Sequence, residues 1–181
     1  MKANTRKLAT MSMLAAISIV LVGIIHFPVF PSAPFLEYDP ADIPIFICTF
    51  LYGPMAGLAL TVVVSAIQAL TVSAGSGVVG ALMHIFATGS FALVAGNIYQ
   101  RSKNRTGAAI AMLMGVLTMT ATMVVWNLIF TPMFLGVPME AVKPMILPVI
   151  VPFNLIKSGI NGIITFLLYK SVSHILKEKA S

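Results

Sequence analysis

The chain has 181 residues, of which 59% are hydrophobic and only 9% are charged, with a net charge of +6. Soluble domains carry about 25% charged residues, so this composition excludes an ordinary soluble protein and indicates an integral membrane protein. The basic residues do not indicate nucleic-acid binding, because they stand in short clusters at the ends of apolar segments, as topology signals do.

The positions of the charges predict a bundle of six transmembrane helices, an all-α fold in a single domain over residues 1–181. Basic clusters at residues 2–7, 101–105 and 170–179 place both termini in the cytoplasm, and the acidic loop at residues 37–42 then lies outside. Three crossings fit between Asp42 and Arg101 if the turns are short. The first apolar run is too long for a signal peptide, and no A-x-A site follows it. The predicted helices cover residues 8–27, 42–53, 55–72, 78–100, 107–131 and 147–173.

The first of these helices contains small residues at Ser12, Ala15 and Ala16. Ser12 and Ala16 form a small-xxx-small pair, which lets two helix backbones approach closely. Such a pair serves packing inside one bundle more often than docking to a separate membrane subunit, and the pattern alone leaves both open.

The loop after the first helix, residues 28–40, contains four prolines and the acids Glu37 and Asp39. It is either a stiff connector whose acids face water or a lid over a cavity. As a lid, it would present Phe35, Leu36 and Tyr38 to a flat ligand.

A lone histidine, His84, lies in the fourth predicted helix. A hydrogen bond between helices explains such a residue better than a metal ligand does. In the fifth helix, Trp126 is typical of an anchor at the membrane interface, and the adjacent Asn127 should face inward.

The last helix contains Lys157, the most informative residue of the chain. A charge near the bilayer centre costs about 2.5–3.5 kcal/mol and is rarely retained without a polar partner or a cavity. Asn154 and Asn161 share its helix face, so this polar stripe must face away from lipid. Because the apolar stretches contain no acid, the stripe predicts a small-molecule site, although an acid of the outer loop could fold in and pair with the lysine.

Several kinds of chemistry have no signal in the chain. There is no P-loop, no H-E-x-x-H motif and no serine nucleophile with a base, so we predict that the protein is not an enzyme and does not hydrolyse ATP. The single cysteine, Cys48, excludes a cysteine-based metal site. The apolar stretches also contain no acid that could bind protons or sodium, which argues against a coupled carrier acting alone.

Four segments resemble the riboflavin-specific S-components, the substrate-binding subunits of energy-coupling factor (ECF) vitamin transporters. The resemblance covers essentially the whole chain. The matching segments are LEYDPADIP at residues 36–44, LYGPMAG at residues 51–57, Trp126-Asn127 before Thr131-Pro132, and PFNLIKSG at residues 152–159.

This resemblance implies a role and partners for the protein. It implies a bacterial plasma-membrane protein that captures riboflavin from outside and delivers it through a membrane-embedded T subunit and two ABC ATPases. Riboflavin is then the transported substrate, and no cofactor is expected. The alternatives are an S-component for flavin mononucleotide (FMN) or a related vitamin, or a stand-alone carrier of small solutes.

The resemblance also assigns residues. Asn127, Asn154 and Lys157 match the family's polar contacts to the vitamin, and asparagine amides can pair with the donor and acceptor edge of a flavin. Further substrate contacts are predicted at Leu36, Tyr38, Asp42 and Trp126. The family's docking surface for the T subunit is expected at Ser12, Ala15 and Ala16, with serine where the family has alanine.

Overall fold

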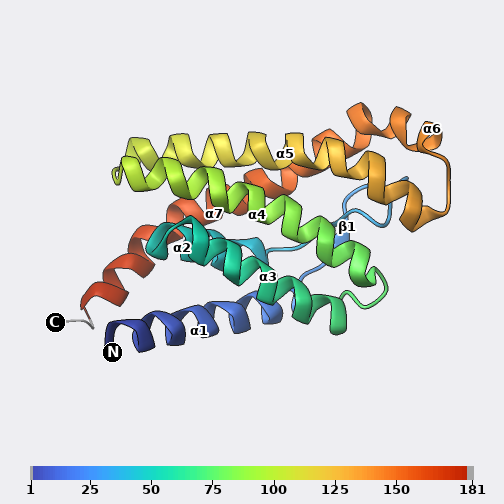
Figure 1. Ribbon diagram of the computed structural model, residues 1–181. Helices are drawn as coiled ribbons and strands as arrows, with labels where there is room; N and C mark the ends of the chain where they lie inside the picture. The colour runs from blue at the N-terminus through green and yellow to red at the C-terminus, as the bar shows by residue number, and fades with distance from the viewer. Residues whose placement is uncertain (1, 179–181) are drawn as a thin grey trace.

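The computed structural model describes residues 2–178, including the side chains of residues 4–169, and shows an elongated bundle of helices (Figure 1). Both termini and the α4–α5 turn lie at one end of the bundle, and α6 and β1 lie at the other. The helices are α1 (Lys2–Ile24), α2 (Asp42–Tyr52), α3 (Pro54–Leu70), α4 (Gly77–Arg101), α5 (Arg105–Leu135), α6 (Met139–Val142) and α7 (Val151–Glu178), with a 3-10 turn at Lys143–Met145 and a π-helical turn at Ile146–Ile150. Two short antiparallel strands, β1 (Phe27–Pro28) and β2 (Glu37–Tyr38), pair within the loop after α1.

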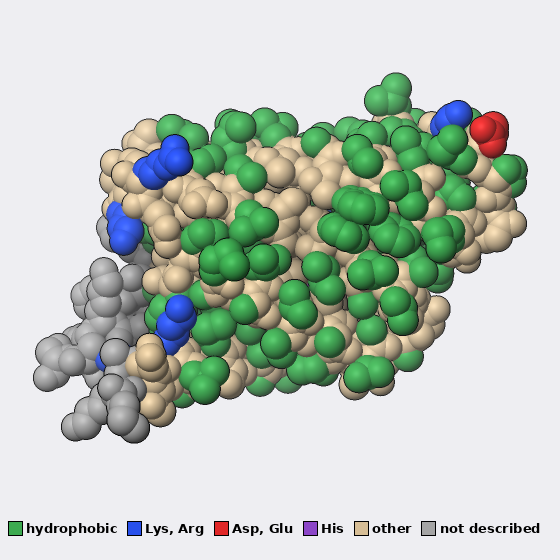
Figure 2. All heavy atoms as spheres, in the orientation of Figure 1, with side chains coloured by type: hydrophobic (Ala, Val, Ile, Leu, Met, Phe, Trp, Pro, Cys, Tyr) green, Lys and Arg blue, Asp and Glu red, His purple; other side chains and the backbone are tan. Residues whose placement is uncertain are grey.

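Four stretches are long and apolar enough to cross a membrane: α1, α4, α5, and the helical run from Met139 to Tyr169. Hydrophobic side chains cover the middle of the molecule, whereas charged side chains stand at its two ends (Figure 2). Large hydrophobic side chains such as those of Leu113, Val125 and Leu167 are exposed on the surface of the molecule. A belt of this kind is stable against lipid rather than water, so the fold is that of a membrane protein.

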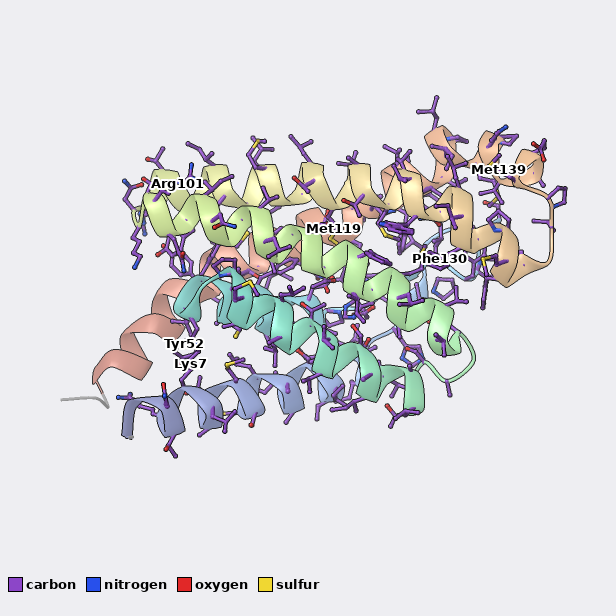
Figure 3. The ribbon with its side chains drawn as sticks, viewed as in Figure 1. Lys7, Tyr52, Arg101, Met119, Phe130 and Met139 are labelled. Carbon is purple, nitrogen blue, oxygen red and sulfur yellow. The ribbon has the colours of Figure 1, made fainter. Side chains whose placement is uncertain are left out.

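The shorter α2 does not cross the membrane alone. Nine of its eleven residues are buried, beginning with Asp42 itself. The helix begins inside the bundle and ends near the terminal end, where Tyr52 lies beside Lys7 (Figure 3). The prediction that Asp42 lies in a water-facing loop is therefore wrong, because the chain after β2 enters the bundle before α2 starts.

The turn between α2 and α3 lies at Gly53-Pro54, a turn signal in the sequence. Gly53 has φ +93°, a conformation that favours glycine, and Pro54 begins α3, where its missing N–H costs no helical hydrogen bond. The two helices can therefore fold back on each other without a loop.

Close packing of α2, α4 and α5 builds part of the hydrophobic core. Phe46 of α2 stacks on Phe91 of α4 with ring centroids 3.6 Å apart. Gly115 of α5 faces that ring, and a Cβ there would lie 2.6 Å from it. The glycine is thus what lets α5 approach.

The predicted outer loop at residues 132–147 is mostly helical. Helix α5 continues through Pro132 to Leu135, where Gly136 ends it with φ +66°. The chain resumes as helix at Met139, and Pro148 lies in the π-helical turn before α7. π-helical turns occur frequently at functional sites, and this one directly precedes Phe153 and Asn154.

Candidate functional site

An open cavity of about 990 Å³, counted with the space at its mouth, lies toward the end of the bundle opposite the termini. Residues from α3, α4, α5, α7 and the loop after β1 line it. Its apolar lining includes Phe35, Leu36, Met119, Met123, Phe130, Phe134 and Phe153.

Two asparagines from different helices face this cavity: Asn127 of α5 and Asn154 of α7. Each is buried and donates one amide N–H to the carbonyl four residues earlier, at 2.7 Å to Met123 and 2.8 Å to Ile150. This bond fixes the orientation of each amide and leaves its second N–H for another acceptor.

Lys157 lies one turn after Asn154 and also lines the cavity. Its Nζ donates to Asp39 Oδ2 at 2.6 Å and to the Glu37 carbonyl at 3.4 Å. The two side chains of this ion pair are 12% and 13% exposed, so the pair is largely shielded from water. An outer-loop acid therefore partners the lysine, and one of the three ammonium donors remains for a ligand.

Asn161, one turn further along α7, forms hydrogen bonds with the same loop, at Tyr38 and Asp39. It accepts from Tyr38 Oη at 3.0 Å and donates to the Asp39 carbonyl at 3.0 Å. Burial, with a smaller effect of the Asp39 carboxylate, raises the pKa of Tyr38, so the phenol keeps the proton it donates. Tyr38 also packs on Phe27 and is not among the residues lining the cavity, contrary to its predicted substrate contact.

Asp42 lies behind the cavity wall rather than in it. It is fully buried and accepts from Thr88 at 2.7 Å, Asn161 at 3.3 Å and His84 Nε2 at 3.0 Å. The prediction that no buried acid exists is therefore wrong, and direct contact of Asp42 with substrate is not what this geometry shows. Instead, Asp42 positions His84, which does line the cavity.

His84 joins three helices, because its Nδ1 also lies 2.7 Å from Ser65 Oγ of α3. The predicted hydrogen bond between helices is confirmed. Within the described residues, no group of three or more His, Cys, Asp and Glu side chains is arranged to hold a metal ion.

Trp126 lies beside the cavity instead of lining it. Its ring stacks on Phe86 with centroids 4.0 Å apart and on Phe130 at 5.3 Å. Phe130 is the member of this stack that also lines the cavity together with Asn127. Trp126 thus supports the wall through Phe130, which differs from its predicted direct contact.

Most of the α5 wall was not predicted from the sequence. Met119, Met123, Asn127, Phe130 and Phe134 recur at intervals of three or four residues, the spacing of one helix face. Their periodicity, taken from Asn127, was the signal available in the sequence. Gln68 of α3 also lines the cavity.

The small residues of α1 divide between two faces. Ser12 and Ala16 are exposed, whereas Ala15 is 8% exposed and belongs to the hydrophobic core. Of these three residues, Ser12 and Ala16 are accessible to another protein, whereas Ala15 packs inside the bundle; docking through this face remains a prediction.

Comparison with known proteins places this geometry in a family. A family model described as "ECF transporter, substrate-specific component" matches residues 6–169. The chain is 29% identical to the riboflavin transporter FmnP of Bacillus subtilis (strain 168), over 98% of this chain and 97% of that protein. It is 32% identical to the riboflavin transporter RibU of Staphylococcus aureus (strain TCH60), over 97% of this chain and 94% of that protein.

A solved structure of the S component of a bacterial ECF transporter has the same fold. It superposes with a TM-score of 0.83 at 30% identity, covering 96% of this chain and 99% of the other. The relatives are transporters and not enzymes, which confirms the prediction that this protein is not an enzyme. The chain belongs to the family of substrate-specific components of ECF transporters, as its motifs predicted.

Proposed function

We propose that this protein is the riboflavin-binding S component of an ECF importer in a bacterial plasma membrane. The observation that carries the proposal is the convergence of Asn127, Asn154 and Lys157, from two helices, on one largely apolar cavity. The relatives named as riboflavin transporters, at 29% and 32% identity over nearly the full chain, support the same substrate.

The cavity suits a flat ligand with one polar edge. A flavin ring has an apolar dimethylbenzene end and a pyrimidine-like edge with carbonyl and ring-nitrogen acceptors and one N–H donor. The second amide N–H of Asn127, the second amide N–H of Asn154 and the third ammonium N–H of Lys157 supply donors for the acceptors of this edge. Phe35, Leu36 and other apolar residues would enclose the rest of the ring. In this proposal, riboflavin is the transported substrate and not a cofactor.

The proposed direction of transport follows from the two ends of the bundle. The cavity and the loop that covers it would face outside, and the basic α4–α5 turn with both termini would face the cytoplasm. The chain has no nucleotide-binding motif of its own. Delivery therefore requires an energising module, which we propose to be the family's T subunit with two ABC ATPases.

Titration of the purified protein with riboflavin and with FMN tests the proposal. We expect riboflavin to bind with quenching of its fluorescence. We expect FMN to bind about tenfold or more weakly, because Lys157, the lysine among the described residues that line the cavity, is already paired and would not neutralise a phosphate. The lysines on this side already have partners: Lys157 pairs with Asp39, and Lys143 lies 3.6 Å from Glu140. Absence of riboflavin binding refutes the function, and equal binding of both flavins would show that the site also accepts FMN.

Hydrogen exchange tests whether the outer loop is a lid. Residues 29–41 are fastened to α7 through Lys157 and Asn161, and Phe35 and Leu36 of the loop would pack against bound flavin. We therefore expect amide exchange across residues 29–41 to slow when riboflavin is added. The control is the turn at residues 101–105, at the opposite end of the bundle. Equal slowing in the two segments would contradict a lid.

A further inference from the structure

The α3–α4 wall of the cavity contains polar side chains to which the family resemblance assigned no role. They are Ser65, Gln68, Ser73, Ser76 and His84. Ser65 and His84 are bonded to each other, and Ser76 Oγ donates to the Ser73 carbonyl. The polar groups of Ser65, His84 and Ser76 therefore have hydrogen-bond partners within the protein.

Gln68 differs from its neighbours. The residue is only 7% exposed. Among the side chains that the structure describes, its Nε2 is the one buried nitrogen or oxygen atom that has no hydrogen-bond partner. Buried polar groups in native proteins are nearly always paired, and Gln68 is one of the residues that line the cavity, so its unpaired amide indicates a ligand acceptor.

Backbone hydrogen bonds fix the main chain at Gln68. The Gln68 carbonyl accepts from the amides of Thr71 and Ser73, which closes the end of α3. The neighbouring wall consists of small residues, among them Ser73, Ser76 and Gly80, so space remains beside the amide. A primary amide next to small side chains suits a narrow, hydroxylated chain better than a broad ring.

We infer that Gln68 is a substrate-specificity residue whose amide hydrogen-bonds the hydroxyl-bearing ribityl chain of riboflavin. This inference rests on the proposed function. The polar ring edge has its partners on α5 and α7, whereas the ribityl chain leaves the central ring and needs partners of its own. A primary amide donates and accepts, and so does each hydroxyl of the chain, so the two match in either direction.

Comparing riboflavin with lumiflavin, which has a methyl group in place of the ribityl chain, tests this assignment. For Gln68→Leu we expect the Kd for riboflavin to rise about three- to tenfold and the Kd for lumiflavin to change less than about twofold. Gln100→Leu is the matched control, because Gln100 is exposed near the other end of α4 and is not among the residues lining the cavity; it should change neither Kd. Asn154→Ala is the contrasting variant and should weaken both flavins.

The outcomes separate this inference from the proposed function. Thermal unfolding of each ligand-free variant checks the fold, and Gln68→Met replaces Gln68→Leu if the latter unfolds early. Equal weakening of both flavins by the Gln68 variant would overturn the ribityl assignment, as would unchanged binding of riboflavin. If the wild-type protein binds neither flavin, the proposed function itself fails, whatever Gln68 does.

Discussion

Lys157→Ala is expected to raise the Kd for riboflavin by about ten- to a hundredfold, because a hydrogen bond from a charged group contributes about 1.5–3 kcal/mol. The lysine has a second task that adds to this loss, since it holds the covering loop through Asp39 at 2.6 Å. Removing it leaves a carboxylate only 13% exposed without its cation. Titration of flavin fluorescence measures the change, and the helix itself should still insert, because a charge has been removed from it.

Two comparisons separate ligand contact from loop attachment. Asp39→Asn removes the ion pair and keeps the lysine, so it weakens binding as much as Lys157→Ala only if attachment of the loop is what matters. Lys143→Ala is the control, since the side chains of the Lys143–Glu140 pair are 54% and 72% exposed, and exposed pairs contribute little. If Lys157→Ala binds riboflavin as the wild type does, Lys157 is not part of the site.

Much of the fold could be predicted from the sequence, because hydropathy and charge act locally. The long apolar runs became α1, α4, α5 and α7, and Gly53-Pro54 marks the turn between α2 and α3. The burial of Asp42 could not be predicted in this way. Its sequence neighbours indicate a polar loop, yet three donors from distant helices compensate the burial of its carboxylate. Such partners are 42 to 119 residues away, so no local pattern indicates them.

The candidate site, too, could be predicted only where a local sequence pattern indicated it. Lys157, Asn154 and Asn127 could be identified because polar groups in apolar helices need a cavity or a partner. Which residues face the cavity depends on helix rotation and on support from neighbours. Trp126 and Tyr38 looked like flat ligand contacts, but the first stacks on Phe86 and the second hydrogen-bonds Asn161. Gln68 gave no signal by itself, since a glutamine in a membrane helix usually bonds a neighbouring helix.

Ala16→Trp is expected to abolish riboflavin uptake by cells while leaving the Kd of the purified protein within about twofold of wild type. Ala16 and Ser12 are exposed on α1, and the cavity is built by other elements. In the proposed importer this face meets the T subunit, and a large side chain in a close contact costs about 1–3 kcal/mol or more, enough to weaken docking about tenfold or beyond. Uptake of labelled riboflavin and titration of the purified variant measure the two effects separately.

Ala121→Trp is the matched control, because Ala121 is an exposed alanine on α5, and a tryptophan there should meet lipid without loss of uptake. Ala15→Trp gives the opposite contrast. Ala15 is buried in the core, so overpacking should impair folding and reduce binding and uptake together. Uptake that survives Ala16→Trp would show that this face of α1 does not dock, whereas joint loss of uptake and binding in that variant would mean that the substitution damages the fold. Only loss of uptake with binding preserved fits a chain that captures its substrate alone and depends on a partner to release it.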